Sequence, residues 1–177
     1  MGDKAAARRY AQAAFSIARD RNDIPGWRAE LGDVAAVLSD SQLAPFFADP
    51  ARPVDEKFRL LERVLDVSPL VTNLAKLLVQ KGRAADARDV AEAFNQLADE
   101  YEGIAHAEVT TAVPLNTEQL QAIESRLAAQ LGKKVIASTR VDPGIIGGAI
   151  VRVGDRLVDG SIRTRLKLLR RELEGAR

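Results

Sequence analysis

The sequence contains no cysteine and a single histidine, His106, among its 177 residues. The lack of cysteine excludes disulfide bonds and thiolate metal sites, and it is typical of a protein from a reducing compartment. One histidine cannot form a histidine-rich metal site, and it supplies little for a catalytic triad. The scarcity of such side chains makes a hydrolase the least favoured class of function.

Long apolar runs are missing as well. No segment approaches the roughly 20 consecutive apolar residues that a membrane-spanning helix needs. The N-terminal segment MGDKAAARRYAQAAF has no apolar stretch long enough for a signal peptide. We therefore expect a chain that is neither secreted by that route nor inserted in a membrane, although a partner can hold it on a membrane complex.

The net charge of +1 is unevenly distributed along the chain. Residues 1–104 carry 14 basic and 17 acidic side chains, whereas residues 105–177 carry 12 basic and 8 acidic ones. The second half is therefore mildly basic, but it falls well short of the composition of a nucleic-acid-binding domain.

The first hundred residues show helical periodicity interrupted by turn residues. Apolar side chains recur at spacings of three and four, as in Trp27, Leu31 and Val34, and we expect Trp27 to anchor the core. Capping residues separate the segments, for example Asp23 before one helix and Gly82 after another. The pattern predicts an N-terminal all-α six-helix bundle over residues 1–104, with helices over about 3–20, 23–38, 41–47, 55–66, 68–81 and 84–102.

From Gly103 onward the pattern changes to that of an α+β domain. The segment HAEVTTAV, residues 106–113, alternates with a period of two, which predicts a strand. Asp159 is expected to cap the last helix, whose apolar stripe of Ile162, Leu166, Leu169 and Leu173 is expected to face inward. The predicted small α+β domain over residues 105–177 also contains a helix from Asn116, strands over 134–141 and 145–153, a hairpin turn at Gly154-Asp155, and the last helix from Ser161.

The segment DPGIIGGAIVRVGDRLVDGS, from Asp142 to Ser161, contains five glycines. A phosphate-binding loop needs a lysine followed by serine or threonine, and a dinucleotide fingerprint opens a helix; this segment has neither feature. One alternative is an RNA-binding module that uses the G-x-x-G loop at 144–147. We favour a structural role, in which the glycines allow turns and close packing, because the flanks are typical of strands.

Three segments together resemble a known family, and the likeness covers essentially the whole chain. RRYAQAAF (Arg8–Phe15) resembles the first helix of the delta subunit of bacterial F-type ATP synthases, whose mitochondrial counterpart is the oligomycin-sensitivity-conferring protein. NLAKLLVQKGR (Asn73–Arg83) resembles the fifth helix of that family. DPGIIGGAIVRVGDRLVDGSIRTRLKLL (Asp142–Leu169) resembles its C-terminal signature, which is long and specific.

The resemblance implies a non-catalytic stator subunit of a proton-translocating ATP synthase. One copy is expected in a hetero-oligomeric complex, peripherally bound at the cytoplasmic face of a bacterial cell membrane. The N-terminal domain is expected to bind alpha subunits of the catalytic head, and the C-terminal domain to bind the b subunits of the peripheral stalk. The role in ATP synthesis and proton transport is mechanical, because the subunit keeps the head from turning with the rotor. The resemblance implies no cofactor, no metal, no nucleic-acid partner and no direct membrane insertion.

By the same resemblance, a helix of an alpha subunit is expected to dock in a groove between the first and fifth helices. The residues predicted to form this groove are Tyr10, Ala13, Ala14, Ile17, Leu74, Leu77 and Leu78. The alternative, that these side chains simply form the core, stays open.

The last helix is rich in basic side chains, namely Arg163, Arg165, Lys167, Arg170 and Arg171. They either form a solvated face or bind an acidic segment of the stalk, where charge steers association and sets orientation. Both interpretations stay open at this point.

Overall fold

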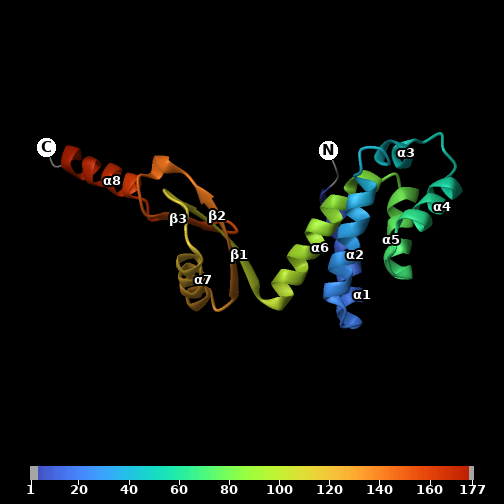
Figure 1. Cartoon of the computed structure of the whole chain (residues 1–177), viewed down its shortest axis with the longest axis horizontal. Coiled ribbons are helices and arrows are strands. Elements are labelled where there is room, and N and C mark those ends of the chain that lie inside the picture. Colours follow the sequence, from blue (N-terminus) through green and yellow to red (C-terminus); the bar gives the residue numbers. More distant parts are fainter. Residues whose placement is uncertain (1–3, 176–177) are drawn as a thin grey trace. The chain divides into compact units, whose positions relative to one another are not determined.

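The computed structural model describes residues 4–175, which form two compact units that divide between Asp99 and Glu100. The first unit is helical, and the second combines helices with one small sheet, which confirms the predicted fold class at this level (Figure 1). The elements of the helical part are α1 (Lys4–Asp20), α2 (Ile24–Leu38), α3 (Ala44–Ala48), α4 (Val54–Val64), α5 (Pro69–Gln80), the 3-10 helix η1 (Ala84–Asp86) and α6 (Ala87–Glu102). The α+β part contains β1 (Ile104–Thr111), α7 (Thr117–Leu131), β2 (Lys134–Val141), the 3-10 helix η2 (Pro143–Ile145), β3 (Ala149–Val153), β4 (Arg156–Asp159) and α8 (Ile162–Gly175).

Several helix ends lie where the local sequence predicts them. Asp23 precedes α2, and its carboxylate accepts a hydrogen bond of 3.1 Å from the Gly26 N–H. Asn116 and Gln119 form a reciprocal capping box at the start of α7. Both arrangements satisfy backbone N–H groups that a helix start leaves without a partner, so the sequence specifies these boundaries locally.

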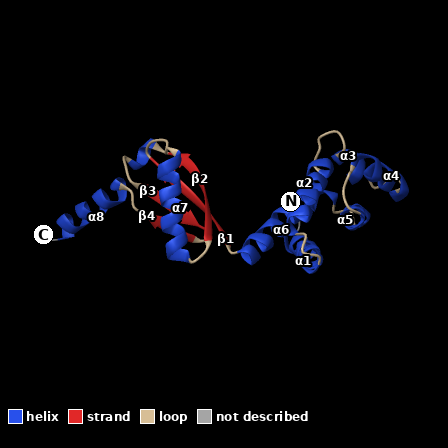
Figure 2. Cartoon of the chain, turned by 60° about the horizontal axis from the view of Figure 1, so that its bottom comes forward, coloured by secondary structure: helices blue, strands red, loops and turns tan. Residues whose placement is uncertain are grey.

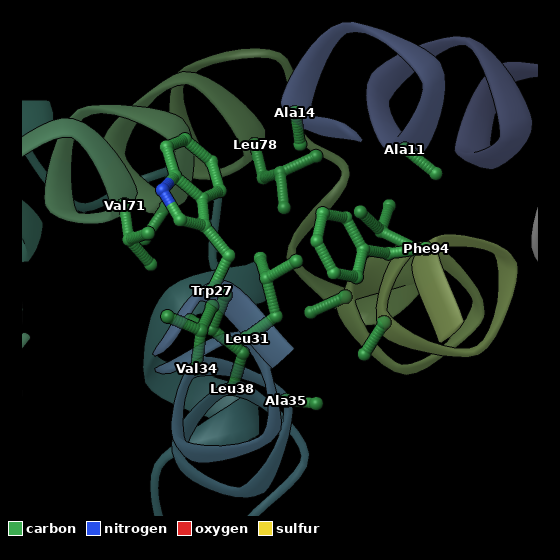
Figure 3. Close-up of a cluster of buried hydrophobic side chains, with 14 of the residues drawn as sticks. Ala11, Ala14, Trp27, Leu31, Val34, Ala35, Leu38, Val71, Leu78 and Phe94 are labelled. Atoms are coloured by element: carbon green, nitrogen blue, oxygen red, sulfur yellow. The ribbon is translucent and has the colours of Figure 1, made fainter. Parts of the chain in front are cut away.

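The core of the first unit forms around aromatic rings covered by small side chains (Figure 3). Trp27 of α2 is 4% exposed and stacks on Phe94 of α6, with ring centroids 6.5 Å apart, which confirms Trp27 as a core anchor. The buried line of α1 consists of alanines, including Ala11 and Ala14, which let this helix approach the rings closely. This line is rotated away from Ala13 and Ile17, which remain exposed.

The sheet of the second unit has the strand order β2-β1-β3-β4. The β1 strand pairs parallel with β2 and antiparallel with β3, and α7 provides the crossover between the two parallel strands. The predicted alternation is confirmed for Ala107, Val109 and Thr111, which are buried. It does not extend to Val113, which lies beyond the end of β1 and is 66% exposed. Helix α7 lies across one face of the sheet (Figure 2).

The strand predicted over residues 145–153 is shorter in the structure. The strand begins only at Ala149, and residues 143–145 form η2 instead. Gly148 has φ +80°, and a Cβ atom there would lie 2.5 Å from the carbonyl oxygen of Gly160. This close approach to a distant part of the chain ends the extended conformation before Ala149, in line with the close packing expected of these glycines.

The apolar stripe of α8 does not face inward, so that prediction is wrong. Its residues Ile162, Leu166, Leu169 and Leu173 are 44%, 52%, 52% and 67% exposed. Helix α8 packs against η2 near its start, and both views show it extending away from the sheet (Figures 1 and 2). Since only the start of the helix meets its own unit, the stripe is left on the surface.

Candidate interaction surfaces

The part of the chain between residues 4 and 175 offers little that suggests chemistry on a bound molecule. Its histidine and carboxylate side chains form no group of three or more that could hold a metal ion. Within the same residues, each helix is too short or too polar to cross a membrane. His106, Glu108 and Arg152 line a hollow of about 250 Å³ on the sheet, beside the apolar Ile136. The features that stand out are instead exposed apolar strips on helices.

The first strip lies on α1 and α5, and we call it the α1/α5 surface. Its five residues are Tyr10, Ala13, Ile17, Leu74 and Leu77. Ile17 is 40% exposed and Leu77 is 38% exposed, whereas Tyr10 and Leu74 are half-buried and pack against the core cluster. Five of the seven residues predicted for the groove therefore reach the surface.

The other two predicted groove residues lie beneath this surface. Ala14 is 2% exposed and Leu78 is 1% exposed. Figure 3 shows them close together between α1 and α5, above the ring of Phe94. They therefore support the strip from below, as core residues, and their side chains do not present area to solvent.

The second strip is the α8 stripe, made of Ile162, Leu166, Leu169 and Leu173. Its spacing of four, three and four is that of a seam between paired helices. Residues 162–171 carry five basic side chains and no acidic one. These are the predicted stalk-binding residues, and all are exposed: Arg163, Arg165, Lys167, Arg170 and Arg171. The exposed helix is therefore amphipathic, with its apolar stripe bordered by positive charge.

Polar contacts fix the start of α8. Asp159 accepts hydrogen bonds from the Ser161 N–H at 2.9 Å and from the Thr164 hydroxyl at 2.7 Å. The buried Ser161 in turn accepts a hydrogen bond of 3.2 Å from the Thr164 N–H. These hydrogen bonds to Ser161 and Thr164 lower the pKa of Asp159, and the charge of Lys167 lowers it further. The side chain that caps the N–H groups of α8 is therefore that of Ser161 and not that of Asp159, so the predicted cap is wrong by two residues. Asp159 instead supports the helix start through the Ser161 N–H and the Thr164 hydroxyl.

The G-x-x-G loop does not have the setting of an RNA-clamping loop. Residues 144–147 lie between β2 and β3, whereas the clamping loop lies between two helices. The Gly144 N–H donates to the Asp142 carboxylate at 2.8 Å, and the side chain of Ile145 is buried. The RNA-binding interpretation is therefore not supported.

Sequence reasoning missed two features of the second unit. It assigned the α8 stripe to the core, because a stripe with helical spacing has the same appearance whether the chain or a partner covers it. It also placed Ile146 inside a strand, whereas the residue has φ +71° and is 63% exposed. The adjacent glycines were the available signal for an irregular backbone at that position.

Two compact units that each carry an exposed apolar strip on their helices are typical of a subunit of a larger assembly. The comparisons specify that assembly: the family model described as ATP synthase delta (OSCP) subunit matches residues 6–173. The chain belongs to this family, whose members are structural stator components of the F-type ATP synthase and not catalytic subunits. It is thus a peripheral component of a membrane-bound complex.

Individual relatives agree over nearly the whole length. An ATP synthase subunit delta from Symbiobacterium thermophilum is 40% identical over 179 residues, which cover 99% of this chain and 96% of the relative. One from Dehalococcoides mccartyi is 35% identical over 173 residues, covering 98% and 96%. A chain from the mitochondrial ATP synthase hexamer of Toxoplasma gondii has a similar fold, with a TM-score of 0.64 and 27% identity over 94% of this chain and 96% of that one.

Proposed function

We propose that the chain joins the alpha subunits of the catalytic head to the b subunits of the peripheral stalk, as one copy at the cytoplasmic face of the membrane. The observation that carries this proposal is that the two apolar strips lie on different units. A protein with one strip per unit can hold two partners at once. It then transmits a holding torque without any chemistry of its own.

The first unit is proposed to hold the head as part of a six-helix bundle domain that extends over residues 1–104. A partner helix on the α1/α5 surface contacts Ile17 and Leu77 through its apolar face, in the helix-in-groove mode. Ala13 has a small side chain, so the partner can approach α1 closely at that point. Ala14 and Leu78 keep the two helices in place beneath the contact.

The second unit is proposed to hold the stalk through α8, as part of a domain that extends over residues 105–177. The α8 stripe supplies apolar contact area, and the five basic side chains favour a partner helix with acidic flanks. Charge at the rim of such a contact contributes to association rate and orientation more than to affinity. The stripe is therefore the expected source of affinity, and the five basic side chains set the orientation of the partner helix.

The proposal is tested by capturing complexes on the tagged full chain from membranes of the source organism. The parent chain is expected to bring down alpha and b subunits together. Ile17→Asp should lose alpha and keep b, whereas Leu169→Asp should lose b and keep alpha, because a charge in an apolar contact is left without a partner. Val64→Asp, on α4, is the matched control, since Val64 is 42% exposed but lies outside both strips.

Two results would contradict the proposal. The first is a parent chain that captures neither subunit. The second is an Ile17→Asp or Leu169→Asp variant that captures both subunits as well as Val64→Asp does. Far-UV circular dichroism of the three variants checks that each retains the helical content of the parent.

A further inference from the structure

Ile146 has a backbone conformation that its side chain disfavours. Its φ is +71°, and Asn22 is the one other non-glycine residue between 4 and 175 with a positive φ. Asparagine tolerates this region, whereas a β-branched residue there is a genuine outlier and costs free energy. A glycine would adopt the same conformation freely.

Burial does not offset this cost. The side chain of Ile146 is 63% exposed, while that of its neighbour Ile145 is 2% exposed and packs inside the unit. The Ile146 N–H donates to the carbonyl oxygen of Pro143 at 3.1 Å, but the exposed apolar side chain gains little from burial in its own unit. Backbone strain of this kind clusters at functional sites such as ligand clamps and switch regions.

Ile146 adjoins the beginning of the α8 stripe. The Ile162 N–H donates to the carbonyl oxygen of Gly147 at 3.0 Å. The Ile162 side chain also lies over Gly147, where an added Cβ would be 2.8 Å from Ile162 Cδ1. Ile146 immediately precedes Gly147, so an exposed apolar side chain lies one residue from the point where the stripe begins.

We propose that Ile146 is an anchor residue of the stalk-binding surface, and that the strained loop holds its side chain out to contact the partner helix. The occupant is the C-terminal helix of the b subunit, lying along the α8 stripe. The charge of this surface supports that choice, since residues 162–171 are basic without an acidic side chain and so match a helix with acidic flanks. This inference rests on the proposed function of the second unit.

The test uses the full chain and a synthetic peptide that covers the C-terminal helix of the source organism's b subunit. Ile146→Gly is expected to weaken peptide binding about tenfold or more in isothermal titration calorimetry, because it removes a buried aliphatic anchor. The same change is expected to raise the Tm of the second unit in differential scanning calorimetry, because it relieves the positive φ. A variant that is more stable yet binds less tightly cannot be explained by misfolding.

Two further variants sharpen the comparison. Val113→Gly also removes an exposed aliphatic side chain from the second unit, where Val113 is 66% exposed and has no positive φ. It should leave peptide affinity unchanged and should not raise the Tm. Ile146→Leu keeps an apolar side chain and is expected to bind within about threefold of the parent.

The outcomes separate this inference from the proposed function. If the parent binds the peptide and Ile146→Gly binds it equally well, the anchor role of Ile146 is wrong and the stalk contact stands. If the parent does not bind the peptide, the stalk contact itself fails, and the anchor role fails with it. Dimerisation of the parent that Ile146→Gly abolishes, or salt-dependent RNA binding that it abolishes, would assign the surface to another occupant and overturn the inference.

Discussion

The side chain of Asp159 couples the start of α8 to pH. Hydrogen bonds from Ser161 and Thr164 lower its pKa, so the folded-state value lies below the unfolded one. An ionised Asp159 therefore stabilises the folded state at pH values above the ordinary carboxyl pKa. That contribution is lost as the pH falls through the folded-state value.

We predict that Asp159→Asn destabilises the second unit at neutral pH and that the difference from the parent shrinks in acid. Urea unfolding, followed by far-UV circular dichroism from about pH 7 to about pH 3, measures this difference directly. Thr164→Val removes one of the two hydrogen bonds that the Asp159 carboxylate accepts, and it should show a smaller effect of the same sign. Parallel pH profiles for parent and Asp159→Asn would show that the hydrogen bonds to Asp159 do not contribute to stability.

At the scale of the helix, neighbouring residues of α1 have opposite roles. Ala14 is buried beside Leu78, whereas Ala13 is exposed on the α1/α5 surface. We predict that Ala14→Asp destabilises the first unit by about 3 kcal/mol or more, because it buries an unpaired charge. Ala13→Asp should change stability by about 0.5 kcal/mol or less and still abolish binding of a peptide that covers the proposed docking helix of the alpha subunit.

Trp27 provides the measurement for both variants. It lies in the same core cluster as Ala14, so its fluorescence reports unfolding of the first unit in urea. Peptide binding to folded Ala13→Asp is measured separately by calorimetry. If Ala14→Asp were as stable as the parent, or if Ala13→Asp bound the peptide normally, the assignment of one residue to the core and the other to the contact would be wrong.

The helices also show which parts of the structure can be predicted from sequence. The cap at Asp23 and the helix start at Asn116 depend on residues a few positions away, and both positions were predicted correctly. The position at which β3 begins, just after Gly148, depends on a close approach to Gly160. The local sequence pattern does not contain that contact. Helical periodicity identified the α8 stripe but not its exposure, because spacing alone does not say which surface covers an apolar face.

The whole molecule raises the question of how a small subunit withstands torque. Burial of roughly 500 Å² of apolar surface contributes about 12 kcal/mol. The loss of freedom on association opposes this gain by about 4–15 kcal/mol. A single docked helix is therefore a weak hold. Two contacts on one chain, both bound to the same assembly, reinforce each other because the second binding event becomes intramolecular.

We predict that cutting the chain between its units loosens both contacts without changing either surface. Helix α6 ends at Glu102 and β1 begins at Ile104, so a protease site inserted after Glu102 lies between elements. After cleavage of the assembled complex, each half should dissociate about a hundredfold or more faster than the intact chain, as the linkage is lost. An uncleaved sample of the same variant is the control for the insertion itself. Dissociation rates are measured by surface plasmon resonance. If cleaved and uncleaved protein dissociated at the same rate, one contact alone would be sufficient, and the two-contact account of the stator would be wrong.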